Sequence, residues 1–284
     1  MRICTYLLKP SRWCMASVLL FALGLFCAQL NAQEIKNSQP AEAQTQPGKK
    51  TIPADSLDSD SNAKKKKKNI RPVFAPVKDV AGLPRVLLIG DSISIGYTLQ
   101  VRNALKGKAN VHRPPANCGP TIRGLQKIDD WLGDREWDVI HFNWGLHDLK
   151  YIGPNNENLA DPNDEKNHQQ VPPAEYEKNL RKLVDRLKKT KAKLIWRNTT
   201  PVPDGAKGRV VGDSIKYNEI AAKVMNESGI AIHDMFGLVQ PKMSELMLPK
   251  GNVHFTKSGS QVLADDSVRI ILDAIKPNET EESK

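Results

Sequence analysis

Short apolar runs alternate with amphipathic segments between residues 84 and 275, and this alternation is the strongest structural signal in the chain. Apolar runs bounded by glycine, proline or polar residues predict buried strands, whereas apolar positions three and four residues apart predict helices. The predicted strands are Val86–Ile89, Asn110–His112, Val139–Trp144, Lys193–Arg197 and Ile230–His233. The predicted helices are Thr98–Leu105, Ile122–Trp131, Pro173–Lys189, Asp213–Glu227 and Thr256–Ile275.

Five strands that alternate with helices indicate an α/β domain whose parallel sheet is covered by helices on both faces. Ligands of open α/β sheets bind outside the carboxyl ends of the strands, so a functional site is expected in the turns that follow the strands. The segment Tyr151–Val171 is long, polar and rich in proline and asparagine. We expect it to be an insert that faces the substrate at this edge.

The first 32 residues have the pattern of a bacterial-type secretory signal peptide. Arg2, Lys9 and Arg12 precede an apolar stretch from Ala16 to Ala28, and Ala32 is a suitable cleavage point. The apolar stretch is shorter than a membrane-spanning helix requires. We therefore predict export to the periplasm or the medium, with an uncleaved N-terminal anchor as the alternative.

Composition changes again after the signal-like segment. Residues 33–80 are dominated by Gln, Ser, Asp, Ala, Pro and Lys, a composition that buries too little apolar surface to fold, and they predict a disordered, lysine-rich linker. The run Lys64–Lys68 is interpreted as solvated, although it could contact anionic lipid. The folded domain is predicted over residues 81–277, followed by a polar tail at 278–284.

Most of the formal net charge of +10 lies outside the predicted domain. Residues 1–32 carry +3, residues 33–72 carry nine basic and five acidic groups (+4), and residues 73–284 carry 30 basic and 27 acidic groups (+3). Because the domain is nearly balanced, the basic pI does not indicate a nucleic-acid partner. Only Cys118 lies after the signal-like segment, so an exported chain could form no intramolecular disulfide.

The turn Gly90-Asp91-Ser92 after the first predicted strand carries the first candidate functional residue. A strand, a sharp turn and a helix would lift Ser92 to the carboxyl edge of the sheet. Backbone N–H groups at the start of that helix suit a developing oxyanion. Taken alone, Ser92 could equally be an ordinary helix cap.

Gly90-Asp91-Ser92 after a strand resembles the first block of the SGNH, or GDSL, hydrolases, and further motifs follow in the family's order from roughly Pro84 to Ile275. The resemblance implies a three-layer α/β/α, flavodoxin-like fold with a five-stranded parallel sheet. It also implies that Ser92 is the nucleophile, with Asp91 supporting it, and that neither a cofactor nor a metal takes part.

The turn after the second predicted strand, Ala116–Thr121, matches the family's second block. A glycine in such a turn lets the backbone approach a ligand and present its N–H. The resemblance assigns that N–H, from Gly119, to the oxyanion hole. The neighbouring Cys118 is interpreted as a small buried residue, and a nucleophilic Cys118 is the weaker alternative.

The third block departs from the family pattern. The family has Gly-x-Asn-Asp, whereas this chain has Gly145-Leu146-His147-Asp148. The resemblance places His147 where the family's Asn donates to the oxyanion, and a neutral imidazole retains one N–H donor for that role. A second base or a metal ligand are alternatives, but no companion cluster has metal-ligand spacing. Asp148 is expected to fix the loop through backbone N–H groups.

The last block, Leu248–Thr256, supplies the histidine that resembles the family's base, His254. The family's acid lies three residues earlier, where this chain has Gly251. The predicted catalytic unit is therefore a Ser92–His254 dyad. A main-chain carbonyl near Gly251 would hold the imidazole tautomer, since the third member of a triad is the most replaceable.

These motifs predict an exported serine esterase that acts through an acyl-enzyme, and by analogy its substrate is a small ester such as an acetylated saccharide. Two other functions stay open. Because both the Asn and the acid are missing, the chain could be a non-catalytic carbohydrate-binding or interaction domain on the same scaffold. A lipid-directed, lysophospholipase-like hydrolase held near a membrane by Lys64–Lys68 is the other.

Overall fold

The computed structural model describes residues 70–276. The predicted signal peptide, the linker up to residue 69 and the polar tail lie outside the described residues. Within the described part of the chain, no helix is both long and apolar enough to cross a membrane.

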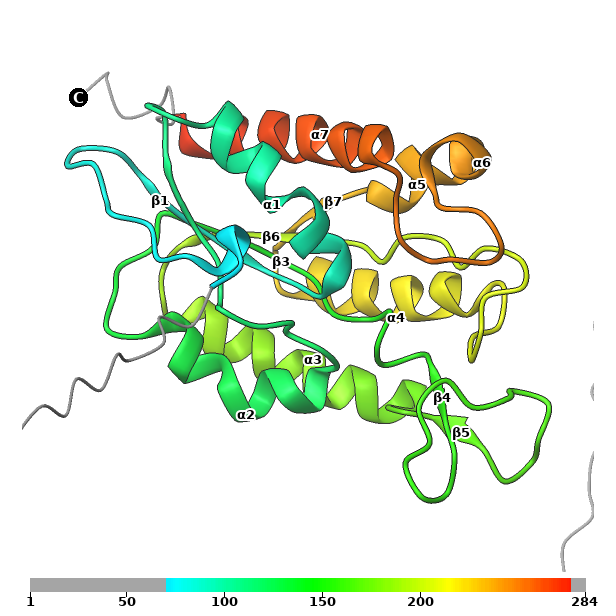
Figure 1. The fold of residues 1–284 in the computed structure, drawn as a ribbon. Helices are drawn as coiled ribbons and strands as arrows, with labels where there is room; N and C mark the ends of the chain where they lie inside the picture. Colours follow the sequence, from blue (N-terminus) through cyan, green and yellow to red (C-terminus); the bar gives the residue numbers. More distant parts are fainter. Residues whose placement is uncertain (1–69, 277–284) are drawn as a thin grey trace, which may run out of the picture. The chain divides into compact units, whose positions relative to one another are not determined.

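The core of the fold is one parallel five-stranded sheet in the order β2-β1-β3-β6-β7, drawn in Figure 1. This order of strands is the flavodoxin-like one, so the predicted fold class and strand number are confirmed. The strands are β1 (Arg85–Ile89), β2 (Asn110–His112), β3 (Val139–Phe142), β6 (Lys193–Arg197) and β7 (Ala231–His233). Each pairs with its neighbours in parallel.

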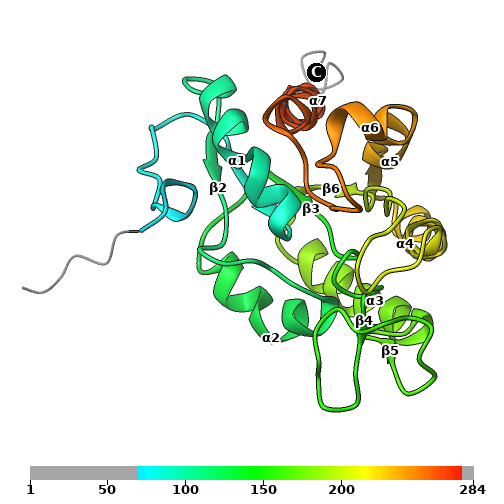
Figure 2. The same cartoon turned by 45° about the vertical axis from the view of Figure 1, so that its right-hand side comes forward.

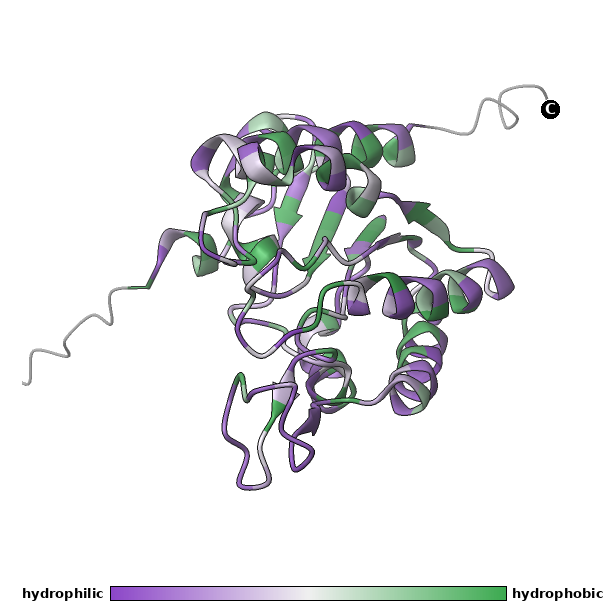
Figure 3. Ribbon diagram, turned by 90° about the vertical axis from the view of Figure 1, so that its right-hand side faces the viewer, coloured by the Kyte–Doolittle hydropathy of each residue, from purple (hydrophilic) through white to green (hydrophobic). Residues whose placement is uncertain are grey.

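Helices cover both faces of the sheet, as Figures 1 and 2 show. α1 (Ser92–Ala104) packs beside α7 (Lys257–Ile275) on one face, and on the other face α3 (Pro173–Lys188) packs between α2 (Thr121–Leu132) and α4 (Asp213–Glu227). Because both faces are covered, β1 and β3 consist almost entirely of buried residues. The sheet is correspondingly hydrophobic in Figure 3.

The remaining elements are short. They are η1 (Pro72–Phe74), β4 (Tyr151–Ile152), β5 (His168–Gln169), α5 (Met235–Val239), η2 (Gln240–Lys242) and α6 (Met243–Leu246). β4 and β5 pair antiparallel inside the predicted insert, which Figure 3 shows as largely hydrophilic. The segment Met235–Leu246 had no helical prediction, because its turns are too short to display a period.

The helix after β1 begins at Ser92, six residues before the predicted start at Thr98. The Asp91 side chain caps it by accepting a hydrogen bond from the Ile93 N–H at 3.0 Å. Ile93, Ser94 and Tyr97 are all buried, so the first turns are enclosed on several sides and lack the amphipathic pattern by which a helix is recognised.

The folded domain also begins before the predicted boundary at residue 81. Val73 is buried, and the carbonyl of Val73 accepts a hydrogen bond from Arg102 Nη1 at 3.0 Å. Asp79 bonds both Arg85 and His112, each at 2.5 Å. Residues 70–80 therefore pack against the domain, because one apolar and one acidic side chain find partners there that composition alone does not reveal.

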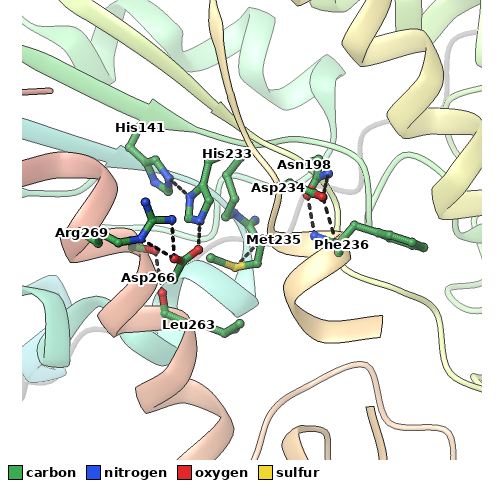
Figure 4. A network of polar contacts seen from close by, with 12 residues as sticks. His141, Asn198, His233, Asp234, Met235, Phe236, Leu263, Asp266 and Arg269 are labelled. Carbon is green, nitrogen blue, oxygen red and sulfur yellow. Dashed lines mark hydrogen bonds and ion pairs between the residues drawn. The ribbon is translucent and has the colours of Figure 1, made fainter. Parts of the chain in front are cut away.

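A polar network crosses the sheet away from the candidate catalytic residues (Figure 4). His141 Nε2 lies 2.9 Å from His233 Nδ1, and His233 Nε2 lies 2.6 Å from Asp266 Oδ2 on α7. Since the carboxylate can only accept, His233 donates from Nε2 and accepts at Nδ1 from His141. Burial lowers the pKa of both histidines, which favours this neutral arrangement.

Candidate active site

Ser92 is the first residue of α1 and lies directly beyond the carboxyl end of β1. Asp91, not Ser92, is the side chain that caps the helix, which removes the capping role as an explanation for the serine. As a first-turn residue, Ser92 has an N–H without an acceptor inside the helix. A side chain at Gly90 would collide with Ser94, so the sharp approach from β1 requires glycine.

His254 is hydrogen-bonded to Ser92, with Nε2 and Oγ 2.9 Å apart. Its other ring nitrogen, Nδ1, lies 2.8 Å from Asn252 Oδ1. Asn252 Oδ1 also accepts the backbone N–H of His254 at 3.0 Å, and only the amide oxygen can accept both bonds. Nδ1 therefore carries the proton, and Nε2 is free to accept the proton of Ser92.

The group that holds Nδ1 of His254 is thus the Asn252 side chain, where the sequence led us to expect a main-chain carbonyl near Gly251. An asparagine side chain readily folds back onto the backbone two residues later, and here that turn also brings Oδ1 to the imidazole. The signal was present, since Asn252 lies two residues before the histidine. The resemblance directed attention to the position three residues before it.

The backbone conformation and the close packing at position 251 require a glycine there. Its φ is +66°, and a side chain there would overlap the backbone of Gly205 and Ala206. The surrounding loop folds back on itself, because Leu248 N–H donates to the His254 carbonyl at 2.8 Å. Gly251 therefore permits the turn that places His254, and no side chain could act from this position.

Asp148 joins the third block to the start of α2. It is buried, and its Oδ1 accepts the backbone N–H of Thr121 at 2.8 Å and the Thr121 hydroxyl at 2.6 Å. These bonds are of the kind expected for a residue that fixes the loop. Burial raises the pKa of Asp148 to about 7, despite the bonds from Thr121.

His147 lines the same cleft as Ser92 and His254. Burial lowers the pKa of its imidazole, with Lys150 and Arg209 adding to the effect and Asp91 opposing it. The neutral ring is therefore favoured, and in that form it has one N–H donor and one acceptor. Inside the described chain the ring makes no hydrogen bond with another residue, so its donor is available to a ligand.

Gly119 does not present a free N–H to the cleft. Its N–H donates to Asn117 Oδ1 at 2.9 Å, and Asn117, not Gly119, lines the cleft. The expected oxyanion role of Gly119 is therefore not realised in this structure, because the asparagine two residues earlier occupies its donor. Cys118 is fully buried, and burial raises the pKa of its thiol to about 11, which argues against a nucleophilic role.

The cleft around Ser92 has a volume of about 390 Å³. A larger hollow of about 680 Å³ lies beside Lys193 and Ala231, at the amino ends of β6 and β7. Only the smaller cleft is at the edge where α/β folds bind ligands. We call this smaller cavity the Ser92 cleft. It is lined by Ser92, Asn117, His147, Lys150, Asn158, Leu159, Gly205, Lys207, Arg209, Lys250, Gly251, Asn252, Val253 and His254.

The predicted insert can be placed against the cleft. Asn158 and Leu159 of the insert lie in its wall, as expected for a substrate-facing segment. No group of three or more His, Cys, Asp or Glu side chains within residues 70–276 is arranged to hold a metal ion. Asn252, Asn117 and the basic residues of the wall were missed by the sequence analysis.

No family model and no curated protein matches the chain. Solved structures do. A lipase/acylhydrolase from Enterococcus faecalis matches with a TM-score of 0.55 and 18% identity over 69% of this chain and 100% of its own. A variant of the acetyl xylan esterase Axe2 from Geobacillus stearothermophilus matches with a TM-score of 0.54 and 18% identity, over 69% of this chain and 97% of its own.

A GDSL-like lipase from Bacteroides thetaiotaomicron also matches, with a TM-score of 0.50 and 15% identity over 72% of this chain and 95% of its own. At such low identity the likeness concerns the backbone arrangement alone. Together with the strand order and the position of the Ser92 turn, it shows that residues 70–276 have the fold of the SGNH hydrolases.

Proposed function

We propose that the protein is a serine carboxylic ester hydrolase whose catalytic unit is Ser92, His254 and Asn252. The observation that carries the proposal is the continuous chain of hydrogen bonds from Ser92 Oγ through both ring nitrogens of His254 to Asn252 Oδ1. A nucleophile, a base within hydrogen-bond reach and a group that orients the base are the signature of nucleophilic catalysis. A merely binding domain would have no use for this tautomer of His254.

In the first step, His254 Nε2 takes the proton of Ser92 while Oγ attacks the ester carbonyl carbon. The tetrahedral intermediate collapses with cleavage of the bond to the alcohol oxygen, which receives the proton from His254. Water then attacks the acyl-enzyme, again giving its proton to His254, and the acid leaves as Ser92 Oγ is reprotonated. One ester and one water become one acid and one alcohol.

The oxyanion that forms in both steps needs donors that are in place before the reaction. The Ser92 N–H at the start of α1 is one donor, helped by the positive end of the helix. The neutral His147 imidazole is the second. Asn117 is a third candidate, because it lines the cleft while its Oδ1 is held by Gly119, which leaves its amide N–H groups for a ligand.

The walls of the Ser92 cleft favour a short acyl group on a polar alcohol. Leu159 and Val253 are the apolar side chains in its wall, against many polar and basic ones. A long acyl chain would need an extended apolar surface, which these walls do not offer. An acetylated saccharide fits them better, and the Axe2 neighbour is an acetyl xylan esterase.

The first 32 residues support the further proposal that the enzyme is exported, since their basic and apolar regions follow the order of a signal peptide. N-terminal sequencing of the protein recovered outside the cytoplasm tests this. A mature chain that begins near residue 33 is expected, and an intact Met1 contradicts cleavage.

The test of the enzymatic proposal is an ester panel, from acetyl to long acyl, with Ser92→Ala as the control. We expect 4-nitrophenyl acetate to be hydrolysed and a fluorophosphonate to label Ser92. Labelling and hydrolysis should both be lost in Ser92→Ala, while its melting temperature stays near wild type. A folded wild-type protein that neither reacts with the probe nor hydrolyses any ester would overturn the proposal.

A further inference from the structure

The Ser92 cleft is lined by four basic side chains and by no carboxylate. The basic residues come from three separate loops: Lys150 follows β3, Lys207 and Arg209 lie between β6 and α4, and Lys250 precedes α7. They are not a charged run in the sequence, because the fold brings them together at the carboxyl edge of the sheet.

Two of these cations are built into the wall. Arg209 is half-buried, and its Nε donates to the carbonyl of Leu146, next to His147, at 3.2 Å. Its Nη1 donates to the Lys207 carbonyl at 3.5 Å. No acidic side chain of the described chain forms an ion pair with it. A guanidinium has five N–H donors, so several are left for a ligand.

Lys150 is the second of these cations. It is half-buried, and its Nζ donates to Asn158 Oδ1 at 2.7 Å, a neutral partner. Burial lowers the pKa of Lys150, and the nearby Arg209 lowers it further. Both cations thus have neutral hydrogen-bond partners, and a bound anion would stabilise them together.

The acidic groups near the cleft do not neutralise it. Asp91 attracts Arg209 and His147, but it is buried, bonded to the Ile93 N–H and not part of the cleft wall. Asp148 attracts Lys150 but is also buried, and Thr121 occupies its Oδ1. Asp161 and Asp204 line an adjacent hollow, which shares Lys207 and Arg209 with the Ser92 cleft.

We propose that the substrate is an acyl ester of an anionic saccharide, whose negative group is bound by Arg209 and Lys150 while its ester lies at Ser92. The proposal rests on the esterase function above. A carboxylate of a uronic acid and a sulfate group share the required chemistry, since both accept paired hydrogen bonds from a guanidinium. A neutral saccharide offers these cations no charged group to bind.

The test compares trisaccharides that differ only in the group at C6 of the sugar units. Acetylated trigalacturonate and acetylated trigalactose differ in having a carboxylate or a CH₂OH at C6, and 6-sulfated acetylated trigalactose is the sulfate arm. At low salt we expect kcat/KM for one anionic substrate to exceed that of the neutral one by at least about tenfold. In 0.5 M NaCl the preference should fall several-fold, because salt screens the attraction.

Variants assign the preference to the cleft. Arg209→Gln and Lys150→Gln should each reduce the ratio of anionic to neutral kcat/KM by about threefold or more. Lys178→Gln, which removes an exposed cation on α3, should leave the ratio unchanged. If Arg209→Gln fails to fold, Lys207→Gln replaces it as the test, because Lys207 also lines the cleft but has an exposed side chain. A ratio near one in the wild type, or a ratio that no cleft variant changes, overturns the proposal.

A binding measurement separates this inference from the enzymatic one. Calorimetry with Ser92→Ala measures how tightly each of the three acetylated trisaccharides binds, without turnover. It therefore shows whether the cleft prefers an anionic ligand. Preferred binding of an anionic trisaccharide by a protein that hydrolyses no ester would sustain the charge preference and reject the esterase. Hydrolysis of 4-nitrophenyl acetate without any anion preference would do the opposite.

Discussion

His233 and His254 each use both ring nitrogens in hydrogen bonds, and the two sets of contacts have opposite properties. His233 has the stronger partner, the Asp266 carboxylate at 2.6 Å, but it is buried and its second nitrogen meets another imidazole. His254 has only the neutral amide of Asn252 at 2.8 Å, but it is exposed and its second nitrogen meets a hydroxyl. Of these two histidines, the buried one has the carboxylate, and the one suited to catalysis lacks it.

This difference shows that a histidine can act as a base only if its unprotonated nitrogen faces the nucleophile and the substrate can reach it. Burial raises the pKa of Asp266, but hydrogen bonds from Arg269 and His233 lower it more, so this half-buried carboxylate stays ionised. That arrangement ties β3 and β7 to α7 and stabilises the fold. At His254, the amide oxygen of Asn252 holds the proton on Nδ1 and so leaves Nε2 free to accept the proton of Ser92.

Exchanging the two histidines for alanine should separate their roles most clearly. His254→Ala should lower kcat by about four to six orders of magnitude, because it removes the proton acceptor of Ser92, with little change in stability. His233→Ala should lower the free energy of unfolding by about 2–4 kcal/mol, because it leaves buried polar groups without partners. Kinetics on 4-nitrophenyl acetate and urea unfolding measure the two effects.

Within that comparison, the kcat/KM of folded His233→Ala should stay within a few-fold of wild type. Loss of activity in folded His233→Ala would show that the core relay reaches the active site. Near-normal activity in His254→Ala would remove His254 as the base.

The second effect in size concerns the oxyanion donor. His147→Ala should remove one donor and lower kcat by about two to three orders of magnitude. His147→Asn should keep much of the activity, because an amide supplies an N–H at the same place. The measurement is kcat/KM for both variants on one acetyl ester, and equal, near-wild-type values would place His147 outside the oxyanion hole.

A smaller effect is expected at Asn252. Asn252→Ala removes the acceptor that fixes the tautomer and should lower kcat by about 10–100-fold. Asn252→Asp keeps an oxygen for Nδ1–H and for the His254 N–H, so its activity should stay near that of wild type or exceed it. By contrast, Gly251→Asp, which would restore the family's spacing, should disrupt the loop because Gly205 fills the space. If Asn252→Ala is as active as wild type, the amide has no orienting role.

The sheet could be predicted because buried parallel strands are apolar runs, and all five strands were placed within about two residues of their observed positions. The start of α1 and the packing of residues 70–80 could not be, because enclosed turns and isolated contacts leave no period. The sequence also predicted that Ser92 and His254 lie together, because each belongs to a local motif at the carboxyl edge of the sheet, and the two side chains do meet there.

The rest of the site depends on contacts between side chain and backbone within single loops. Whether Gly119 offers its N–H depends on the rotamer of Asn117, and the partner of His254 depends on the path of the loop around Gly251. The basic wall depends on three loops meeting. Asn117 and Asn252 lie near their partners in the sequence, but which group each side chain contacts is decided by the folded loop.

The last prediction concerns the pH dependence of the core relay. The pKa of His141 lies well below 6.5, because burial and the neighbouring His233 and Arg197 all disfavour its charged form. Below about pH 6.5 the unfolded chain therefore binds a proton that the folded chain does not, and stability falls with acid by at most about 1.4 kcal/mol per pH unit from this group. Asp148 has the opposite sign, since its raised pKa of about 7 means that the folded chain holds the extra proton. We therefore compare the free energy of urea unfolding of wild type and His141→Gln between pH 5 and 8. The difference between the two proteins cancels contributions that both share, such as that of Asp148. We expect the His141→Gln curve to be flatter below pH 6.5, and parallel curves would show that His141 is not kept neutral by the fold.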